Sequence, residues 1–161
     1  ANGDNRNLLA VHSMSKRSNL AGYRAALIVG DSELVARIRE VRKHAGMMVP
    51  LPIQRALTVA LKDEKHVQAQ SLIYANRRNK LKPALEKAGF KVEFSEAGLY
   101  IWCTRGEKSW DSVTWLSKLG ILVAPGSFYG PAGEKNIRVA LTASDAKINE
   151  AAERILAAIS K

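Results

Sequence analysis

The sequence contains 161 residues, 47% hydrophobic and 25% charged, with a net charge of +10, a composition typical of a globular domain rather than of a disordered or fibrous chain. Its single cysteine, Cys103, excludes an internal disulfide and a cysteine-cluster metal site and suits a reducing compartment. No apolar run is long enough to span a bilayer, and the polar first ten residues exclude a secretory signal core, so we expect a cytoplasmic protein.

Hydrophobic periodicity divides the chain into alternating strands and helices. Apolar residues three and four apart indicate helices, and continuous or alternating apolar runs indicate strands. Pro83 falls inside one helical pattern, where it predicts a kink or a boundary. The expected elements, in chain order, are strands at 8–11 and 25–29, helices at 32–45, 53–61 and 64–88, strands at 90–94 and 99–103, a helix at 110–119, strands at 121–124 and 137–141, and a helix at 144–159.

This order of elements predicts a mixed α/β fold with a boundary near residues 48–52. Residues 1–50 supply only two strands and one helix, which are too few for an independent sheet layer. We therefore expect residues 1–50 to be the tail of a larger domain. Residues 51–161 have enough helix and strand to form a compact α+β small domain.

Polar side chains cluster where the first strand ends. The apolar run 8–11, expected to be a buried strand, leads directly into a loop that carries Ser13, Ser15 and Lys16, and Arg24 precedes the next strand. Hydroxyls and a guanidinium together suit a phosphate monoester, because they form several charge-assisted hydrogen bonds at once. A lysine held beside another cation can lose its proton and attack a carbonyl carbon. A phosphorylated aldehyde that fits both features is pyridoxal 5'-phosphate.

These residues also match a known family pattern. Ser13, Ser15, Lys16 and Arg24 stand in the pattern Ser-x-Ser-Lys-x(7)-Arg, which resembles the fold-type-I pyridoxal-phosphate aminotransferases of class I/II. Two later segments are similar to the same family in the same order, Pro125–Gly130 and Asn136–Leu141. The resemblance covers the whole chain but only the C-terminal part of a family member.

The resemblance implies a role for each matched residue. Lys16 is expected to bind the cofactor covalently and then to move a proton between the substrate and the cofactor. Ser13, Ser15 and Arg24 are expected to hold the cofactor phosphate, and Arg138 to bind the substrate carboxylate through a bidentate pair. Tyr129 or Phe128 is expected to line the site.

The resemblance also implies a homodimer whose sites lie at the subunit interface. By the same resemblance, the acid that keeps the cofactor ring protonated is expected outside this chain. We therefore expect the isolated chain to have little or no transaminase activity. The three histidines show no ligand-like spacing with carboxylates or Cys103, so no metal site is expected.

A closer resemblance concerns the substrate. The segments His12–Arg24 and Arg42–Pro50 are similar to succinyldiaminopimelate aminotransferases of lysine biosynthesis. Such a substrate is strongly anionic, so Arg17, Lys43 or His44 near the site would suit it. The expected reaction exchanges an amino group between N-succinyl-LL-2,6-diaminopimelate and 2-oxoglutarate.

Two alternatives remain open at this stage. Another reaction on the same scaffold, catalysed by a lyase or synthase, is compatible with the same motifs because a fold does not fix the reaction. The net charge of +10 also admits a regulatory nucleic-acid-binding protein that reuses this domain. The densest basic group is Arg77, Arg78, Lys80 and Lys82 on one helix, where a solvated face is the simpler interpretation.

Overall fold

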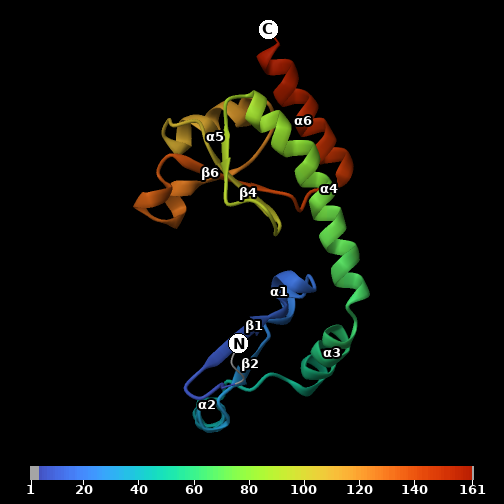
Figure 1. Ribbon diagram of the computed structural model, residues 1–161, viewed down its shortest axis with the longest axis vertical. Helices are drawn as coiled ribbons and strands as arrows, with labels where there is room; N and C mark the ends of the chain where they lie inside the picture. Colours follow the sequence, from blue (N-terminus) through green and yellow to red (C-terminus); the bar gives the residue numbers. More distant parts are fainter. Residues whose placement is uncertain (1–3, 161) are drawn as a thin grey trace. The chain divides into compact units, whose positions relative to one another are not determined.

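The computed structural model describes residues 4–160, which form two compact units (Figure 1). The first unit ends at Gln68 and the second begins at Ala69. Helix α4 (Lys65–Lys87) carries the chain from one unit into the other. Over residues 4–160, no helix combines the length and the apolar composition needed to cross a membrane.

The first unit is built on an antiparallel strand pair. β1 (Leu9–Ser13) pairs with β2 (Ala26–Gly30), and the register runs from Leu9 opposite Gly30 to Ser13 opposite Ala26. The chain between the strands forms a short helix, α1 (Met14–Arg17), and a 3-10 turn, η1 (Ala21–Tyr23). Both strands were predicted, but β1 is exposed along its whole length, so the expectation that it is buried is wrong for this chain. The reason is that β2 is its only strand partner within residues 4–160, and two strands cannot cover their own faces.

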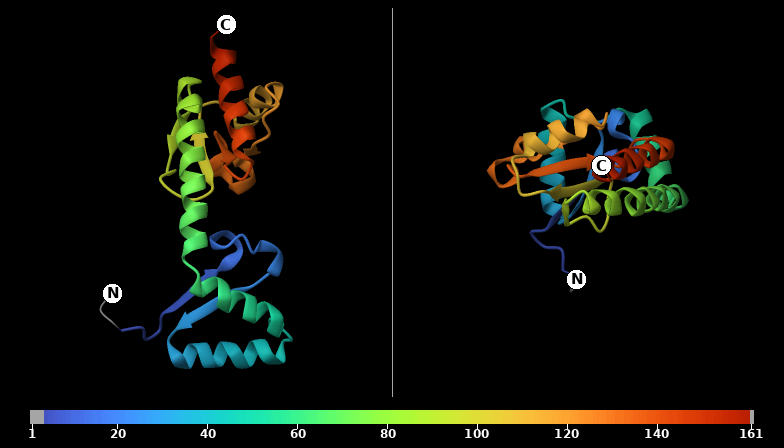
Figure 2. Two further views of the ribbon diagram at one scale, coloured as in Figure 1. Left: turned by 90° about the vertical axis from the view of Figure 1, so that its right-hand side faces the viewer. Right: turned by 90° about the horizontal axis from the view of Figure 1, so that it is seen from above.

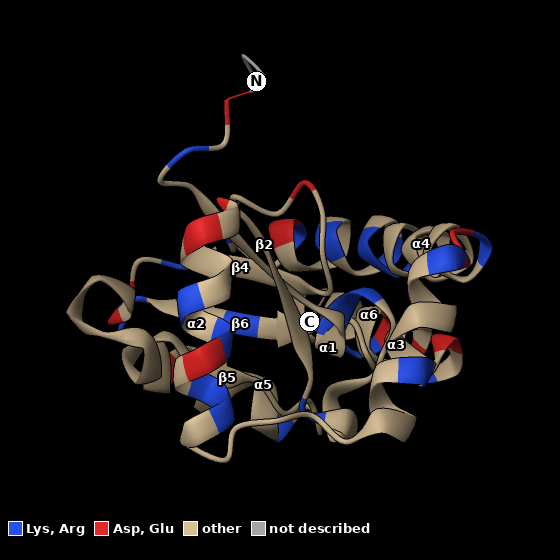
Figure 3. Ribbon diagram, turned by 90° about the horizontal axis from the view of Figure 1, so that it is seen from below, with Lys and Arg blue, Asp and Glu red and all other residues tan. Residues whose placement is uncertain are grey.

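Two helices complete the first unit. α2 (Ser32–His44) begins at Asp31, whose carboxylate accepts hydrogen bonds from the N–H groups of Glu33 at 2.8 Å and Leu34 at 3.1 Å. Acidic and basic residues are spread along α2 (Figure 3), which has no buried residue.

α3 (Leu51–Lys62) packs with the segment that connects β1 to β2. Leu57 of α3 forms a small core with Met14 and Ala25, so residues just beyond 50 belong to the first compact unit. The compact units thus divide near residue 68 rather than near residue 50. The assignment of residues 1–50 and 51–161 to two domains of the whole protein stays a prediction.

The second unit contains a four-stranded antiparallel sheet in the order β3-β4-β6-β5. Its strands are β3 (Lys91–Glu93), β4 (Tyr100–Thr104), β5 (Ala124–Pro125) and β6 (Asn136–Ala140). Two 3-10 turns, η2 (Gly126–Tyr129) and η3 (Pro131–Gly133), connect β5 to β6.

One face of this sheet carries the main core. Alternate residues of β4 and β6 are buried there and pack with α4, α5 (Ser109–Lys118) and α6 (Asp145–Ile159). Figures 1 and 2 show α4 and α6 side by side. α4 runs through Pro83 without ending, so Pro83 is not a boundary. The core residues are Leu81, Ala84, Leu85, Phe90, Ile101, Cys103, Val113, Leu116, Val123, Ile137, Val139, Leu141, Ile148, Ala152 and Ile155.

Candidate functional site

The predicted lysine lies in a short turn, residues 13–18, which we call the lysine turn. Ser13 ends β1 and caps α1, because its Oγ accepts a hydrogen bond from the N–H of Ser15 at 3.2 Å. The N–H of Ser18 donates to the carbonyl of Met14 at 3.1 Å and closes the turn. Met14 is fully buried, whereas Lys16 is exposed. The turn therefore packs on one side and presents its lysine on the other.

Arg24 lies at the same end of the strand pair as Ser13. The register places Ser13 opposite Ala26, only two residues after Arg24. Arg24 has a φ of 50°, in the left-handed region that is uncommon for residues other than glycine. Such backbone conformations are concentrated at ligand-binding sites. One guanidinium nitrogen, Nη1, donates to the carbonyl of Ala21 at 3.0 Å, and the side chain is otherwise exposed.

The structure thus gathers Ser13, Ser15, Lys16 and Arg24 at one end of the β1–β2 pair. The hydroxyl and guanidinium donors can form several hydrogen bonds to one phosphate, and the amine can attack one aldehyde. This donor set fits pyridoxal phosphate. It does not resemble a metal site, and residues 4–160 contain no group of three or more histidine, cysteine or acidic side chains that could hold a metal ion.

Arg138 lies in the second unit, on the sheet face opposite the main core. Its neighbours in β6, Ile137 and Val139, are buried in that core, so Arg138 points the other way. The guanidinium carbon lies 4.1 Å from the ring centre of Tyr100 and 5.0 Å from that of Tyr129. We call these three residues the arginine cluster. Trp102 borders it, with its ring 5.8 Å from the Tyr129 ring in an edge-to-face contact.

The guanidinium of Arg138 has unused hydrogen-bonding capacity. Its Nε is buried and has no hydrogen-bond partner within residues 4–160. A buried donor without an acceptor is unfavourable, so the site suits an incoming anion. A carboxylate that pairs bidentately with the guanidinium would supply the missing acceptor.

Sequence reasoning identified Arg138 but did not identify Tyr100 or Trp102 as its neighbours. The alternation of buried Ile101 and Cys103 with these aromatic residues was a usable signal, because antiparallel pairing puts Trp102 opposite Arg138. The structure also separates the two aromatic candidates next to each other in sequence. Tyr129 contacts Arg138, whereas Phe128 makes an edge-to-face contact with Trp110 at 5.9 Å.

The basic residues considered for an anionic substrate have partners of their own. Arg17 forms an ion pair with Glu64. Lys43 lies 3.4 Å and His44 3.8 Å from a carboxylate oxygen of Glu40. Arg17 belongs to the lysine turn itself, but its guanidinium is already paired, and Lys43 and His44 both lie near the Glu40 carboxylate.

Comparisons with known proteins give a consistent result. The sequence profile of the family described as aminotransferase class I and II matches residues 1–155. A probable aminotransferase of Mycobacterium tuberculosis is 58% identical over 153 residues, covering 95% of this chain and 37% of that protein. A 4-dedimethylamino-4-oxo-anhydrotetracycline transaminase of Streptomyces rimosus is 57% identical over 153 residues, covering 95% of this chain and 43% of that protein. An LL-diaminopimelate aminotransferase of Oleidesulfovibrio alaskensis is 36% identical over 148 residues, covering 89% of this chain and 38% of that protein.

Solved structures agree with these relatives. A probable N-succinyldiaminopimelate aminotransferase of Thermus thermophilus has a TM-score of 0.85 at 27% identity, covering 98% of this chain and 44% of that one. An aminotransferase of Neisseria meningitidis has a TM-score of 0.84 at 32% identity, covering 96% and 41%. The chain spans less than half the length of the relatives that it matches.

Proposed function

Because this chain belongs to the class I and II aminotransferases, a family that uses pyridoxal phosphate, we propose that it is part of a transaminase in which Lys16 holds the cofactor. The whole protein would transfer an amino group between an amino acid and a 2-oxo acid. The mixed helix and sheet of the chain is part of the fold-type-I architecture. The observation that carries the proposal is the gathering of Lys16, two serines and Arg24 at one end of the β1–β2 pair, with Arg24 in a left-handed conformation.

Each group at the lysine turn has a distinct task in this proposal. The Ser13 and Ser15 hydroxyls and the Arg24 guanidinium hold the phosphate through charge-assisted hydrogen bonds. Lys16 Nζ would hold the cofactor through its aldehyde carbon and, once displaced from that carbon by the substrate amine, would as a free amine carry a proton to and from the α-carbon of the substrate. The bound cofactor supplies an electron-withdrawing ring. The exposure of Lys16 supports this task, because the amine is accessible from outside its own turn.

Arg138 binds and orients the substrate in the same proposal. Its guanidinium pairs with the α-carboxylate, and a bidentate pair fixes the direction of the substrate as well as its position. The guanidinium lies over the rings of Tyr100 and Tyr129, and these cation–π contacts stabilise its position. The buried, unpartnered Nε supports this role.

For the substrate we propose N-succinyl-LL-2,6-diaminopimelate as amino donor and 2-oxoglutarate as acceptor. Similarity to a diaminopimelate aminotransferase at 36% identity and to a probable N-succinyldiaminopimelate aminotransferase at 27% identity supports it. The relative at 57% identity favours a second candidate, amination of a polycyclic ketone, because its name gives an oxo-anhydrotetracycline as its substrate.

Turnover of the whole protein tests these proposals. The amino donors to compare are N-succinyl-LL-2,6-diaminopimelate and LL-diaminopimelate, each with 2-oxoglutarate. 4-Dedimethylamino-4-oxo-anhydrotetracycline with glutamate tests the second candidate. We expect the succinylated donor to give the highest kcat/KM and Lys16→Ala to abolish turnover with all three. Elimination products without amino transfer would instead indicate a lyase, and higher kcat/KM for the tetracycline would replace our substrate assignment.

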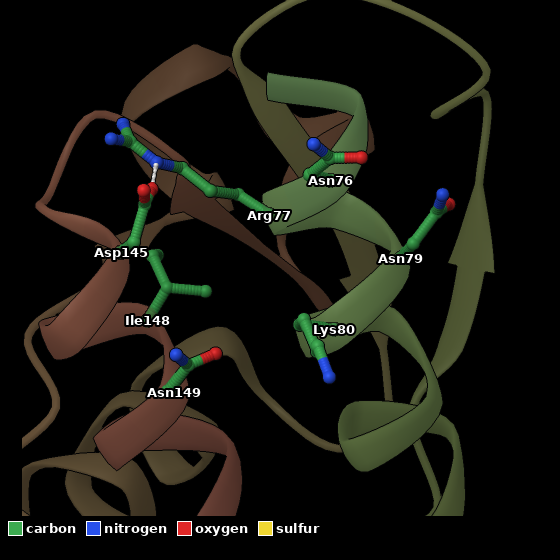
Figure 4. A pocket seen from close by; sticks show the side chains of 7 residues that line it. All are labelled: Asn76, Arg77, Asn79, Lys80, Asp145, Ile148 and Asn149. Carbon is green, nitrogen blue, oxygen red and sulfur yellow. Dashed lines mark hydrogen bonds and ion pairs between the residues drawn. The ribbon is translucent and has the colours of Figure 1, made fainter. Parts of the chain in front are cut away.

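The nucleic-acid alternative loses support from the arrangement of the basic cluster. Arg77 lies 2.5 Å from a carboxylate oxygen of Asp145 (Figure 4). It also donates to the carbonyl of Leu141 at 3.0 Å. Arg78 is buried, with a hydrogen bond to the carbonyl of Gly98. These two guanidinium groups are used within the second unit and do not form a basic surface. Salt-sensitive DNA binding by the whole protein would restore the alternative.

The state of the whole protein is also a proposal. We expect a cytoplasmic homodimer, by analogy with the family, and little or no turnover by residues 1–161 alone. Burial raises the pKa of the Cys103 thiol to about 12, so this thiol stays protonated near neutral pH. It therefore takes no part in the proposed chemistry.

A further inference from the structure

A chain of hydrogen bonds lies beneath the lysine turn. The Oγ of Ser18 lies 2.9 Å from Nε2 of His66, and Nδ1 of His66 lies 3.1 Å from Oδ2 of Asp63. The other carboxylate oxygen of Asp63 accepts a hydrogen bond from the N–H of Lys65 at 2.9 Å, at the start of α4. Because an ionised carboxylate only accepts, Nδ1 carries a proton, and in neutral His66 the Nε2 atom accepts from the Ser18 hydroxyl.

The residue before Ser18 is tied to the same place. Arg17 pairs with Glu64 and donates to the carbonyl of Ala60 at 3.4 Å, and only 18% of its side chain is exposed. We call residues 60–66, which join α3 to α4, the anchoring junction. Two consecutive residues of the lysine turn therefore contact it. Met14 adds a third attachment, because it is fully buried against Leu57 of α3.

These attachments share one side of the turn. Residues three and four apart in a helix face the same way, so Met14, Arg17 and Ser18 form the packed side. Lys16 follows Met14 by two residues and lies about 200° around the helix axis. The anchoring junction therefore holds the back of the turn whose front carries the lysine.

We propose, on the basis of the proposed function, that His66 and Ser18 are positioning residues for Lys16. In this role they act through the turn that carries Lys16 and not by binding the cofactor or the substrate. The Ser18-His66-Asp63 chain fixes the residue that caps the C-terminus of α1, and this fixes the direction in which Lys16 leaves the turn. The distances also match those of a hydrolytic serine triad, but the Asp63 side chain is 50% exposed, whereas the aspartate of such a triad is buried.

Paired substitutions in the whole protein test this role. Ser18→Ala removes the hydroxyl and Ser18→Thr keeps it. His66→Phe removes both ring nitrogens, and His66→Gln keeps a polar atom near the position of Nε2. We expect Ser18→Ala and His66→Phe to lower kcat about tenfold, because a displaced reacting group costs rate. Thr and Gln should restore most of kcat, and the KM for the amino donor should change little, since substrate carboxylate binding is left intact.

Two further comparisons separate positioning from general damage. Glu64→Gln breaks the ion pair with Arg17, and the control Glu150→Gln breaks ion pairs with Arg154 and Lys147, far along the sequence in α6. Only Glu64→Gln should lower kcat. Amide hydrogen exchange of the cofactor-free protein gives a readout that needs no catalysis. Ser18→Ala and His66→Phe should speed exchange of residues 15–18 about tenfold, with unchanged exchange in the core of the second unit.

The double variant Ser18→Ala, His66→Phe completes the test. Its loss of kcat should equal that of either single variant, because both remove the same hydrogen bond. The inference is overturned if wild-type protein transaminates while kcat and exchange at residues 15–18 are the same in all variants. Failure of the proposed function has a different signature, since wild-type protein would then show no transamination at all.

Discussion

Replacing Arg138 by lysine tests the carboxylate site most sharply, because lysine keeps the positive charge and removes the planar guanidinium group. The guanidinium can donate two parallel hydrogen bonds to a carboxylate, whereas the lysine ammonium acts as a point charge. One charge-assisted hydrogen bond contributes about 1.5–3 kcal/mol. The guanidinium also loses its stacking on Tyr100 at 4.1 Å and Tyr129 at 5.0 Å, which contributes about 0.5–1 kcal/mol.

Together these losses amount to about 2–4 kcal/mol, or roughly a 30- to 1000-fold decrease in kcat/KM for a donor with an α-carboxylate. The assay follows conversion of the donor by the whole protein, with the decarboxylated amine of the same donor as a matched substrate. Arg138→Lys should leave the slow reaction of that amine nearly unchanged, and cofactor affinity should not move. Equal losses with both substrates would refute the carboxylate assignment, because the defect would then not depend on the group that Arg138 is proposed to bind.

Three other predictions follow from local geometry. Arg24→Gly should weaken cofactor binding about 10- to 100-fold, because it removes charge-assisted hydrogen bonds. The free energy of unfolding of the cofactor-free protein should change little, because glycine accepts a φ of 50°. A large change in that free energy would contradict this prediction. Gly126→Ala should lower the free energy of unfolding, measured with denaturant, by about 3 kcal/mol, because a Cβ there would lie 2.2 Å from the carbonyl oxygen of Gly133. In the control Gly22→Ala the new Cβ meets nothing within 4 Å, so the free energy of unfolding should hardly change. Hydrogen bonds, first from the Asn7 N–H, lower the pKa of the Asp31 carboxyl. The ionised carboxylate therefore stabilises the fold above about pH 4, and this stabilisation is lost as the pH falls through the folded-state pKa. The free energy of unfolding of Asp31→Asn should decline less steeply in acid than that of the wild-type protein, and identical acid profiles would disprove this.

Local sequence signals predicted most of the elements. The strand before Lys16, the helix capped by Asp31 and the alternating strand that carries Arg138 all follow from periodicity and capping. The effect of Pro83 on its helix was harder to predict, because local rules favour a kink or a boundary at a proline. α4 does not end there, because the neighbouring Leu81 and Leu85 pack in the core. The exposure of β1 could not be predicted either, since burial of a strand depends on partners that its own residues do not specify.

In the candidate site, too, residues close together in the sequence could be predicted, whereas contacts between residues far apart in the sequence could not. Ser13, Ser15, Lys16 and Arg24 are close in sequence, so a motif finds them together. His66 lies 48 residues from Ser18, and no periodic pattern links a histidine at the start of one helix to a serine at the end of another. For Tyr100 and Arg138, alternation within each strand indicates the shared face, but their contact also depends on the strand register, which neither strand specifies alone.

The central claim is that Lys16 is the residue that binds pyridoxal phosphate. Borohydride reduction of the whole protein with the cofactor, followed by peptide mapping, tests it directly by fixing the pyridoxyl group where it is bound. We expect the label on the peptide that contains Lys16, and its loss in Lys16→Arg. A label on any other lysine, or no label in protein that transaminates, would contradict it.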